Sequence, residues 1–144
     1  MRLISFELAK QLAMNGFNEY TSNAYAIKEG VEYSPLLNDC CFTTTIGKLV
    51  RDYESAVLDE DDLKEFIKAP SYAHVLAWMR TTKHIDVAIV RSNDITKTYH
   101  FEIIINGEYT NQIIQKVIPN RDYYEAAKDA IQYCIDNNIF KSNN

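Results

Sequence analysis

The stretch Tyr99-His-Phe-Glu-Ile-Ile-Ile105, followed at once by Asn106-Gly107, decides the fold of this chain. Every second side chain in it is large and apolar, which is the period-two pattern of a half-buried β-strand. Asn106-Gly107 is the preferred pair for a two-residue type I′ hairpin loop, because both loop positions need positive φ. The sequence therefore predicts a strand over 97–105 that turns back into a third strand over 109–118.

The segments on both sides of this hairpin predict one more strand and two helices. Apolar residues recur at every second position from Ile85, which indicates a strand over 85–91. A helix over 72–83 begins after the N-cap Ser71, and a helix over 122–138 begins near Asp122, where Glu125 completes a capping box. Each helix has one apolar stripe, so both are expected on the Phe101 face of the sheet. The stripes are Tyr72, Val75, Leu76 and Met79 in the first helix, and Tyr123, Ala127, Ala130, Ile131 and Cys134 in the second.

The N-terminal part is patterned less regularly. Ser5 is expected to cap a helix over 6–15 that ends at Gly16, a residue suited to the left-handed position after a helix. The segment 25–33 predicts two short strands around Glu29-Gly30, and the β-branched run 40–46 predicts another. Residues 58–68 are expected to hold a helical turn or two.

The predicted fold class is therefore α+β, with residues 1–144 in a single domain. Its N-terminal part, 1–69, has one helix and a short β or irregular segment. Its C-terminal part, 70–144, is a module of helix, three-stranded antiparallel sheet and helix. A length of 144 residues with 47% hydrophobic and 24% charged residues is typical of one globular domain.

Cysteine usage and the lack of long apolar runs predict a cytoplasmic protein. Cys40 and Cys41 are adjacent, which disfavours a bridge between them, and Cys134 falls on an apolar helix stripe, so reduced thiols are expected. No apolar run approaches the roughly 18 residues of a membrane span. Glu7 and Lys10 interrupt the N-terminal apolar residues, so neither a signal peptide nor a membrane partner is predicted.

Charge argues against nucleic acid as a partner. The net charge is −5, and residues 1–69 carry 7 Lys/Arg against 12 Asp/Glu, while 70–144 carry 8 of each. Helix, three strands and helix is also the order of the double-stranded RNA-binding domain, so a nucleic-acid-binding module is the alternative function. Those domains bind through lysines at the start of the second helix, whereas Asn120-Arg121-Asp122-Tyr123-Tyr124-Glu125 is nearly neutral here. Trp78 is expected at the edge of the core rather than as a stacking platform.

The sequence offers no residue that we expect to be catalytic, cofactor-binding or metal-binding. It has no glycine-rich phosphate loop, no His-Glu-x-x-His and no Cys-x-x-Cys. His74 is expected on the helix face opposite the core stripe, His84 at that helix's end and His100 on the solvent side of its strand, so the histidines do not converge. A Cys40-Cys41 nucleophile and a cation site at 59–62 are weaker interpretations than buried thiols and a solvated helix start. An enzyme of unrecognised class is the third interpretation.

Three stretches are distinctive: Ala69-Pro70-Ser-Tyr-Ala-His-Val-Leu-Ala-Trp-Met-Arg80, Lys83-His84-Ile85-Asp86-Val87 and Tyr123-Tyr-Glu-Ala-Ala-Lys-Asp-Ala130. Together they resemble a group of small uncharacterised proteins from Bacteroidetes genomes and their prophages. The resemblance covers residues 3–17 and 69–138, and residues 18–68 match poorly. It implies a genomic context and no activity.

One apolar strip suggests a role in protein contact. With a two-residue loop at Asn106-Gly107, four side chains point away from the Phe101 face: Ile104, Tyr109, Ile113 and Val117. Such a strip is too apolar for bare solvent, so it is expected under residues 18–57, under a second copy or under an unknown protein partner. The first expectation for function is a non-enzymatic, phage-related accessory protein of a prophage or mobile element that acts through protein–protein contact.

Overall fold

A computed structural model describes residues 2–34, 40–53, 65–91, 98–105, 108–110 and 122–142. For 28–34, 40–46, 108–110 and 142 the description covers the backbone. Within these residues the chain has helices α1 to α4 and two three-stranded sheets, so the predicted α+β class is confirmed.

The C-terminal sheet contains β4 (Ile85–Arg91), β5 (Tyr99–Ile105) and β6 (Glu108–Thr110) in the order β4-β5-β6. Both pairs are antiparallel, and Ile105 lies opposite Glu108, as a two-residue connection requires. The predicted strands over 85–91 and 97–105 are confirmed within the described residues. Residues 111–118 of the predicted third strand lie outside them.

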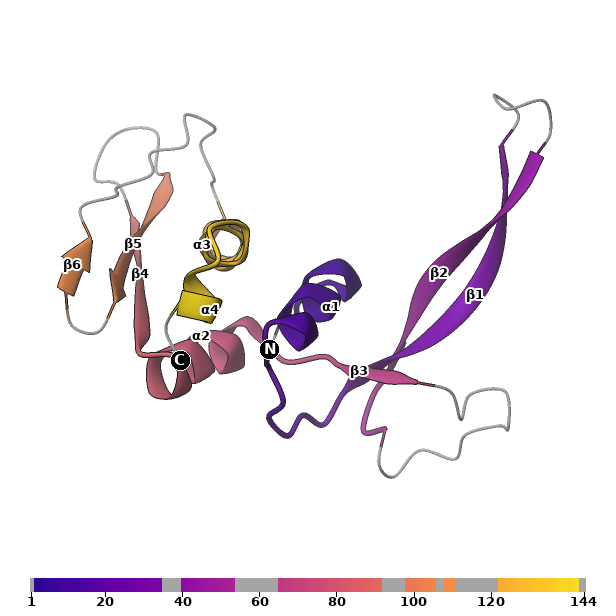
Figure 1. The fold of residues 1–144 in the computed structure, drawn as a ribbon, viewed down its shortest axis with the longest axis horizontal. Helices are drawn as coiled ribbons and strands as arrows, with labels where there is room; N and C mark the ends of the chain where they lie inside the picture. Colours follow the sequence, from indigo (N-terminus) through magenta and orange to yellow (C-terminus); the bar gives the residue numbers. More distant parts are fainter. Residues whose placement is uncertain are drawn as a thin grey trace.

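Both long C-terminal helices cover the same face of this sheet (Figure 1). They are α2 (Tyr72–Thr82) and α3 (Tyr123–Asp136), and they share one core with alternate residues of β4 and β5. The buried strand residues are Ile85, Val87, Phe101 and Ile103. The predicted packing of two single-stripe helices on the Phe101 face is therefore confirmed.

The stripe predicted for α3 was wrong at one position. Tyr123 is 41% exposed and Ala126 is buried in its place. Tyr123 is the first residue of the helix, where its ring stands edge-on to the rings of Tyr99 and Tyr124 at 6.2 and 5.5 Å. Contacts with Tyr99 at the start of β5 and with the neighbouring helix residue Tyr124 therefore hold this ring outside the core.

A short helix that the sequence reading missed closes the core at the C-terminal side. It is α4 (Ile139–Ser142), which follows Asn138 at φ 55°. Phe140 is 1% exposed and lies 5.5 Å from the ring of Trp78, which is itself 2% exposed. Trp78 therefore packs rather than forming an exposed platform, as predicted, but it lies inside the core and not at its edge.

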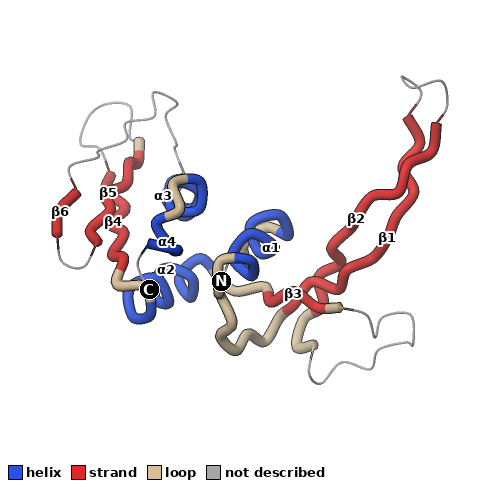
Figure 2. Tube along the Cα trace, in the orientation of Figure 1, coloured by secondary structure: helices blue, strands red, loops and turns tan. Residues whose placement is uncertain are grey.

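The second sheet has the order β2-β1-β3 and extends away from the helices (Figure 2). Its strands are β1 (Ala24–Ser34), β2 (Cys40–Val50) and β3 (Phe66–Lys68). The strand predicted over 40–46 is confirmed, and it continues to Val50. Two other expectations were wrong: 25–33 lies within one strand, and 66–68 is a strand rather than part of a helical turn.

Strand pairing explains both corrections. The β1–β2 ladder runs without interruption from Ala24↔Val50 to Ser34↔Cys40, so Gly30 pairs with Thr44 and does not break the strand. Residues 66–68 pair with Ala24 to Ala26 of β1, and this long-range pairing overrides the local helical pattern.

Helix α1 (Phe6–Met14) lies between the two sheets (Figure 1). Its predicted N-cap is confirmed, because Ser5 Oγ accepts from the Leu8 amide at 3.3 Å. Gly16 has φ 95°, and the amide of Phe17 donates to the carbonyl of Leu12 at 3.0 Å, which closes the helix in a Schellman arrangement. The bend returns the buried Phe17 to the core beside Leu12.

Candidate functional site

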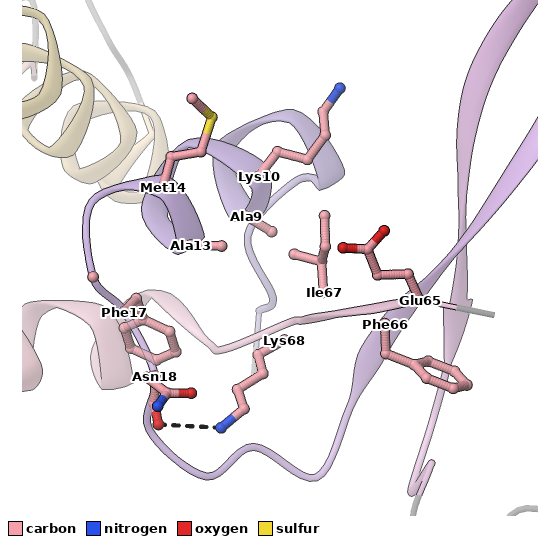
Figure 3. A pocket seen from close by; sticks show the side chains of 11 residues that line it. Ala9, Lys10, Ala13, Met14, Phe17, Asn18, Glu65, Phe66, Ile67 and Lys68 are labelled. Carbon is pink, nitrogen blue, oxygen red and sulfur yellow. Dashed lines mark hydrogen bonds between the residues drawn. The ribbon is translucent and has the colours of Figure 1, made fainter. Parts of the chain in front are cut away.

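An open groove of about 510 Å³ lies between α1 and β3 (Figure 3). Two alanines and two long side chains, Lys10 and Met14, form the α1 wall, β3 forms the other, and residues 16–18 close one end. The wall residues that matter most below are Ala9, Ala13, Met14, Glu65, Ile67 and Lys68.

The helical wall of the groove has an exposed apolar rim. Met14 is 83% exposed, the highest value among the large hydrophobic side chains of the described residues. Ala13 beside it is exposed as well, whereas Ala9 is buried against the core. Figure 3 shows Ile67 pointing from β3 toward this helix. The middle of the groove is therefore apolar.

The opposite wall is a strand edge. In the order β2-β1-β3, strand β3 has a neighbour on one side only among the described residues. The Ile27 amide donates to the Glu65 carbonyl and the Ala69 amide to the Asn23 carbonyl, both at 3.0 Å. Residues 65, 67 and 69 therefore direct their backbone groups toward β1. Because successive residues of a strand alternate in this respect, the backbone N–H and C=O of Phe66 and Lys68 point to the free edge.

Charged groups stand at the two ends of the groove. Glu65 is exposed, and no ion pair to it is found among the described residues. Lys68 Nζ donates to the carbonyl oxygen of Asn18 at 3.1 Å (Figure 3), and the described residues place no carboxylate in ion-pair contact with it. Lys10 is paired with Glu7 at 3.1 Å and lies 4.8 Å from the centre of the Phe6 ring.

Sequence reasoning missed this groove. The sequence predicts a helical turn or two within 58–68 rather than a strand at 66–68, and its apolar spacing places Ala13 on the buried face of the first helix, whereas Ala13 is exposed. The local sequence offers one weak sign of a strand, Phe66-Ile67-Lys68. In an extended chain Ile67 points to one face and its two neighbours to the other. That pattern is too short to identify a strand without its partner β1.

The structure places part of the predicted interaction strip. Ile104 is half-buried and is the cross-strand partner of Tyr109. Ile113 and Val117 lie outside the described residues. The expectation that 18–57 covers this strip does not hold for the described part of that segment, because β1 and β2 lie at the opposite end of the molecule (Figure 1). A partner or a second copy remains as the expected cover.

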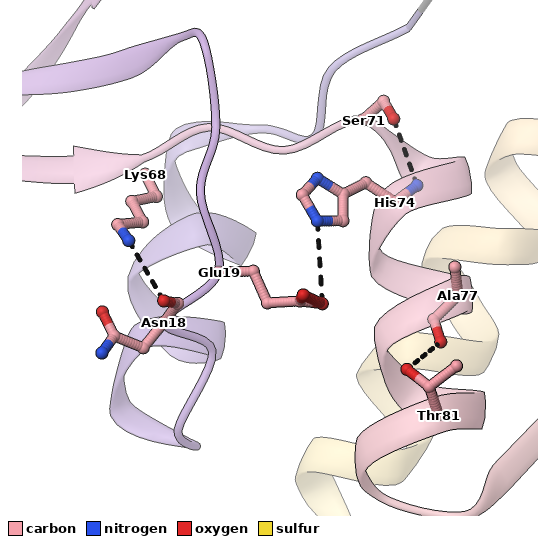
Figure 4. Close-up of polar contacts among 7 residues, drawn as sticks. All are labelled: Asn18, Glu19, Lys68, Ser71, His74, Ala77 and Thr81. Carbon is pink, nitrogen blue, oxygen red and sulfur yellow. Dashed lines mark hydrogen bonds and ion pairs between the residues drawn. The ribbon is translucent and has the colours of Figure 1, made fainter. Parts of the chain in front are cut away.

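The histidines are separated, and one of them was misplaced by the sequence reading. His74 is not on the face opposite the core: its ring stands edge-on to Phe17 at 5.5 Å, and Nε2 lies 3.7 Å from Oε1 of Glu19 (Figure 4). The reason is the Schellman bend at Gly16, which brings residues 17–19 across this side of α2. His84 is exposed after α2, and His100 is half-buried with Nε2 3.9 Å from Glu102 Oε1.

The described residues contain no group of three or more His, Cys, Asp or Glu side chains arranged to hold a metal ion. Cys134 is a fully buried free thiol, and burial raises its pKa to about 12, which opposes a role as a nucleophile. The side chains of Cys40 and Cys41 lie outside the described residues. None of the helices described is long and apolar enough to cross a membrane.

Comparisons of the chain with protein-family models, with curated proteins and with solved structures found no match.

Proposed function

We propose that this protein acts through protein–protein contact, without chemistry of its own, and that the groove between α1 and β3 is its main contact surface. One observation carries the proposal: an exposed methionine, Met14, stands on the rim of an apolar groove whose other wall is a strand edge with no partner among the described residues. Exposed methionine is common at surfaces that bind other proteins, because its thioether side chain adapts to different shapes.

The proposal includes two expectations drawn from the sequence. The first is the complete module over 70–144, with its third strand continuing through 109–118 and carrying Ile113 and Val117 beside Ile104. That strip would be a second contact surface. The second is the context of a prophage or mobile element in Bacteroidetes, which rests on the resemblance of residues 3–17 and 69–138 alone. A flanking run of phage genes would support it.

A photo-crosslinking amino acid at position 14 tests the contact directly. We expect a covalent adduct heavier than the chain when the probe replaces Met14 in the cells that encode the protein. The matched control is the same probe at Thr81, which is exposed on α2 outside the groove.

The adduct should disappear when Ala13→Gln is added to the Met14 probe, because the longer side chain fills the groove. Mass spectrometry would identify the captured chain, and an adduct of twice the chain's mass would indicate self-association. Equal adducts from positions 14 and 81, or none from position 14, would contradict the proposal.

A further inference from the structure

We infer that the groove takes an extended peptide segment of a partner protein, which adds to β3 as a further antiparallel strand. The inference rests on the proposed function and names the chemistry of the partner: an acidic residue, an apolar residue, any strand-forming residue and a basic residue, in that order. Three features of the groove lead to this pattern.

The first feature is the unpaired backbone of β3. The N–H and C=O groups of Phe66 and Lys68 point away from β1, and no hydrogen bond to them is found among the described residues. A row of such groups is a template for another strand, since each group gains a partner when an extended chain lies beside it. A globular surface or a small apolar molecule would leave them without partners.

The second feature is the apolar wall opposite that edge. Directly opposite residues of an antiparallel pair share a face, so the peptide residue across from Ile67 points toward α1. There it meets Ala13 and the Met14 rim, which leave room for a Val or Leu side chain. The residue across from Phe66 points to the other face.

The third feature is the charge at each end. Glu65 is exposed just before β3, and within the described part of the chain the Lys68 ammonium group bonds to a carbonyl oxygen and to no carboxylate. An antiparallel peptide runs from Lys68 toward Glu65, so an acidic residue comes first and a basic residue last. All strand pairs of the two sheets are antiparallel, and we assign the same direction to the added strand.

A second copy of the chain fits this edge less well. Pairing β3 with its own copy would bring the α1 of that copy to the same edge, where the first α1 already flanks β3 (Figure 3). A single extended segment needs only the spacing of one strand, about 4.8 Å from β3.

The probe that we propose is a fluorescently labelled peptide, Thr-Glu-Val-Thr-Lys-Thr, added to the purified full chain. In the proposed register the amides of Glu and of the central Thr donate to β3, while the Val amide points away from it. N-methylation of the central Thr amide should weaken binding about fivefold or more, because one hydrogen bond is lost. N-methylation of the Val amide is the matched control and should change the affinity by less than about twofold.

Charge exchange tests the direction of the strand. Glu65→Lys should weaken the Lys-containing peptide, and the peptide with Glu at that position should bind the variant better than it binds the wild type. Ala13→Gln should weaken both peptides, whereas Ala77→Gln, the same change at an exposed position of α2, should leave them unchanged.

The free protein provides a further check by amide hydrogen exchange. We expect the amides of Phe66 and Lys68 to exchange much faster than that of Ile67, which is directed to β1. Protected Phe66 and Lys68 amides would show that a segment of the chain itself occupies the edge and would overturn the inference. Equal effects of the two N-methylations, or no peptide binding, would also overturn it.

The two proposals fail separately. A partner crosslinked through position 14 with no binding of the peptide would leave protein contact intact and remove strand addition. The absence of both would remove both.

Discussion

Arg2 Nη1 donates to Oδ2 of Asp122 at 3.0 Å and so ties the segment ahead of α1 to the N-cap of α3. Asp122 uses its other carboxylate oxygen, Oδ1, to accept from the Tyr124 amide at 2.8 Å. The same side chain therefore begins a helix and holds the N-terminal segment. The amide of Tyr124 first, and Arg2 second, lower the pKa of Asp122 below its ordinary value of 3.8.

A lowered carboxylate pKa makes stability depend on pH in a defined direction. The contribution of Asp122 is fully present above the pKa it has in the unfolded chain and is lost as the pH falls through its lower folded value. The Asp122→Asn variant keeps the N-cap acceptor. We expect its free energy of unfolding to fall less steeply than that of the wild type as the pH decreases below 3.8. Urea unfolding midpoints across the acidic range would measure this. Parallel curves for variant and wild type would contradict the assignment.

Gly47 is expected to resist substitution because the ring of Phe6 lies directly on it. A Cβ at position 47 would overlap the ring, and moving the ring would disturb its edge-on contact with Tyr25 at 5.4 Å. Gly47→Ala should destabilise the protein by about 1–3 kcal/mol, the usual range for overpacking. In the Phe6→Ala background the same change should have almost no effect. Chemical denaturation of the four proteins in this cycle tests the contact, and additive effects would exclude it.

The thiol of Cys134 should be inert in the folded protein. Burial raises its pKa from 9.0 to about 12, so the thiolate forms in the unfolded chain at lower pH than in the folded one. Its contribution to stability is complete below pH 9 and is lost as the pH rises toward 12. The difference in stability between wild type and Cys134→Ala should therefore shrink over this range. Reaction of the native Cys134→Ala variant with a thiol reagent at the same rate and extent as wild type would confirm that Cys134 is protected.

Ile104 should matter for assembly rather than for the core. It is half-buried on the side of the C-terminal sheet away from α2 and α3. If a second copy covers the strip, Ile104→Asp should give a smaller sedimenting species with an unchanged circular dichroism spectrum. Ala77→Asp, at an exposed site on α2, is the control. A folded Ile104→Asp protein with the oligomeric state of wild type would remove self-association through this face.

Duplex nucleic acid should not be retained at physiological salt. The salt-dependent affinity for a duplex comes from phosphates neutralised by Lys or Arg, and the whole chain has 15 of these against 20 Asp and Glu. Arg2 near the start of α3 is already paired with Asp122, and the exposed Arg80 with Asp86 at 3.1 Å. Filter binding or electrophoretic shift with RNA and DNA duplexes tests this. A tight complex whose affinity falls steeply with salt would favour the nucleic-acid-binding alternative.

The sequence predicted best those elements whose signals are local. The helix over 6–15 has its cap at Ser5 and its stop at Gly16 within the same few residues, and the alternation at Tyr99 to Ile105 needs no distant partner to be recognised. These elements lie within one or two residues of their predicted bounds.

What the sequence could not predict depends on distant partners. Residues 66–68 become a strand only because Ala24 to Ala26 pair with them, and His74 is covered only because the bend at Gly16 turns Phe17 onto α2. The groove forms only when 66–68 pair with β1 and when the bend at Gly16 places residues 16–18 at its end. Its walls are about 50 residues apart in sequence, so no local window contains its signal.

The bonds between the start of the chain and the start of α2 have a consequence for synthesis. Leu3 bridges to Ser71, the Ile4 amide donates to the Pro70 carbonyl, and the Tyr72 amide donates to the Arg2 carbonyl. Leu8 and Leu12 of α1 are buried in one cluster with residues of α2 and α3. On the ribosome, α1 therefore emerges long before the residues that cover it. During synthesis the apolar side chains of residues 6–14 therefore stay exposed to solvent until α2 and α3 have left the exit tunnel.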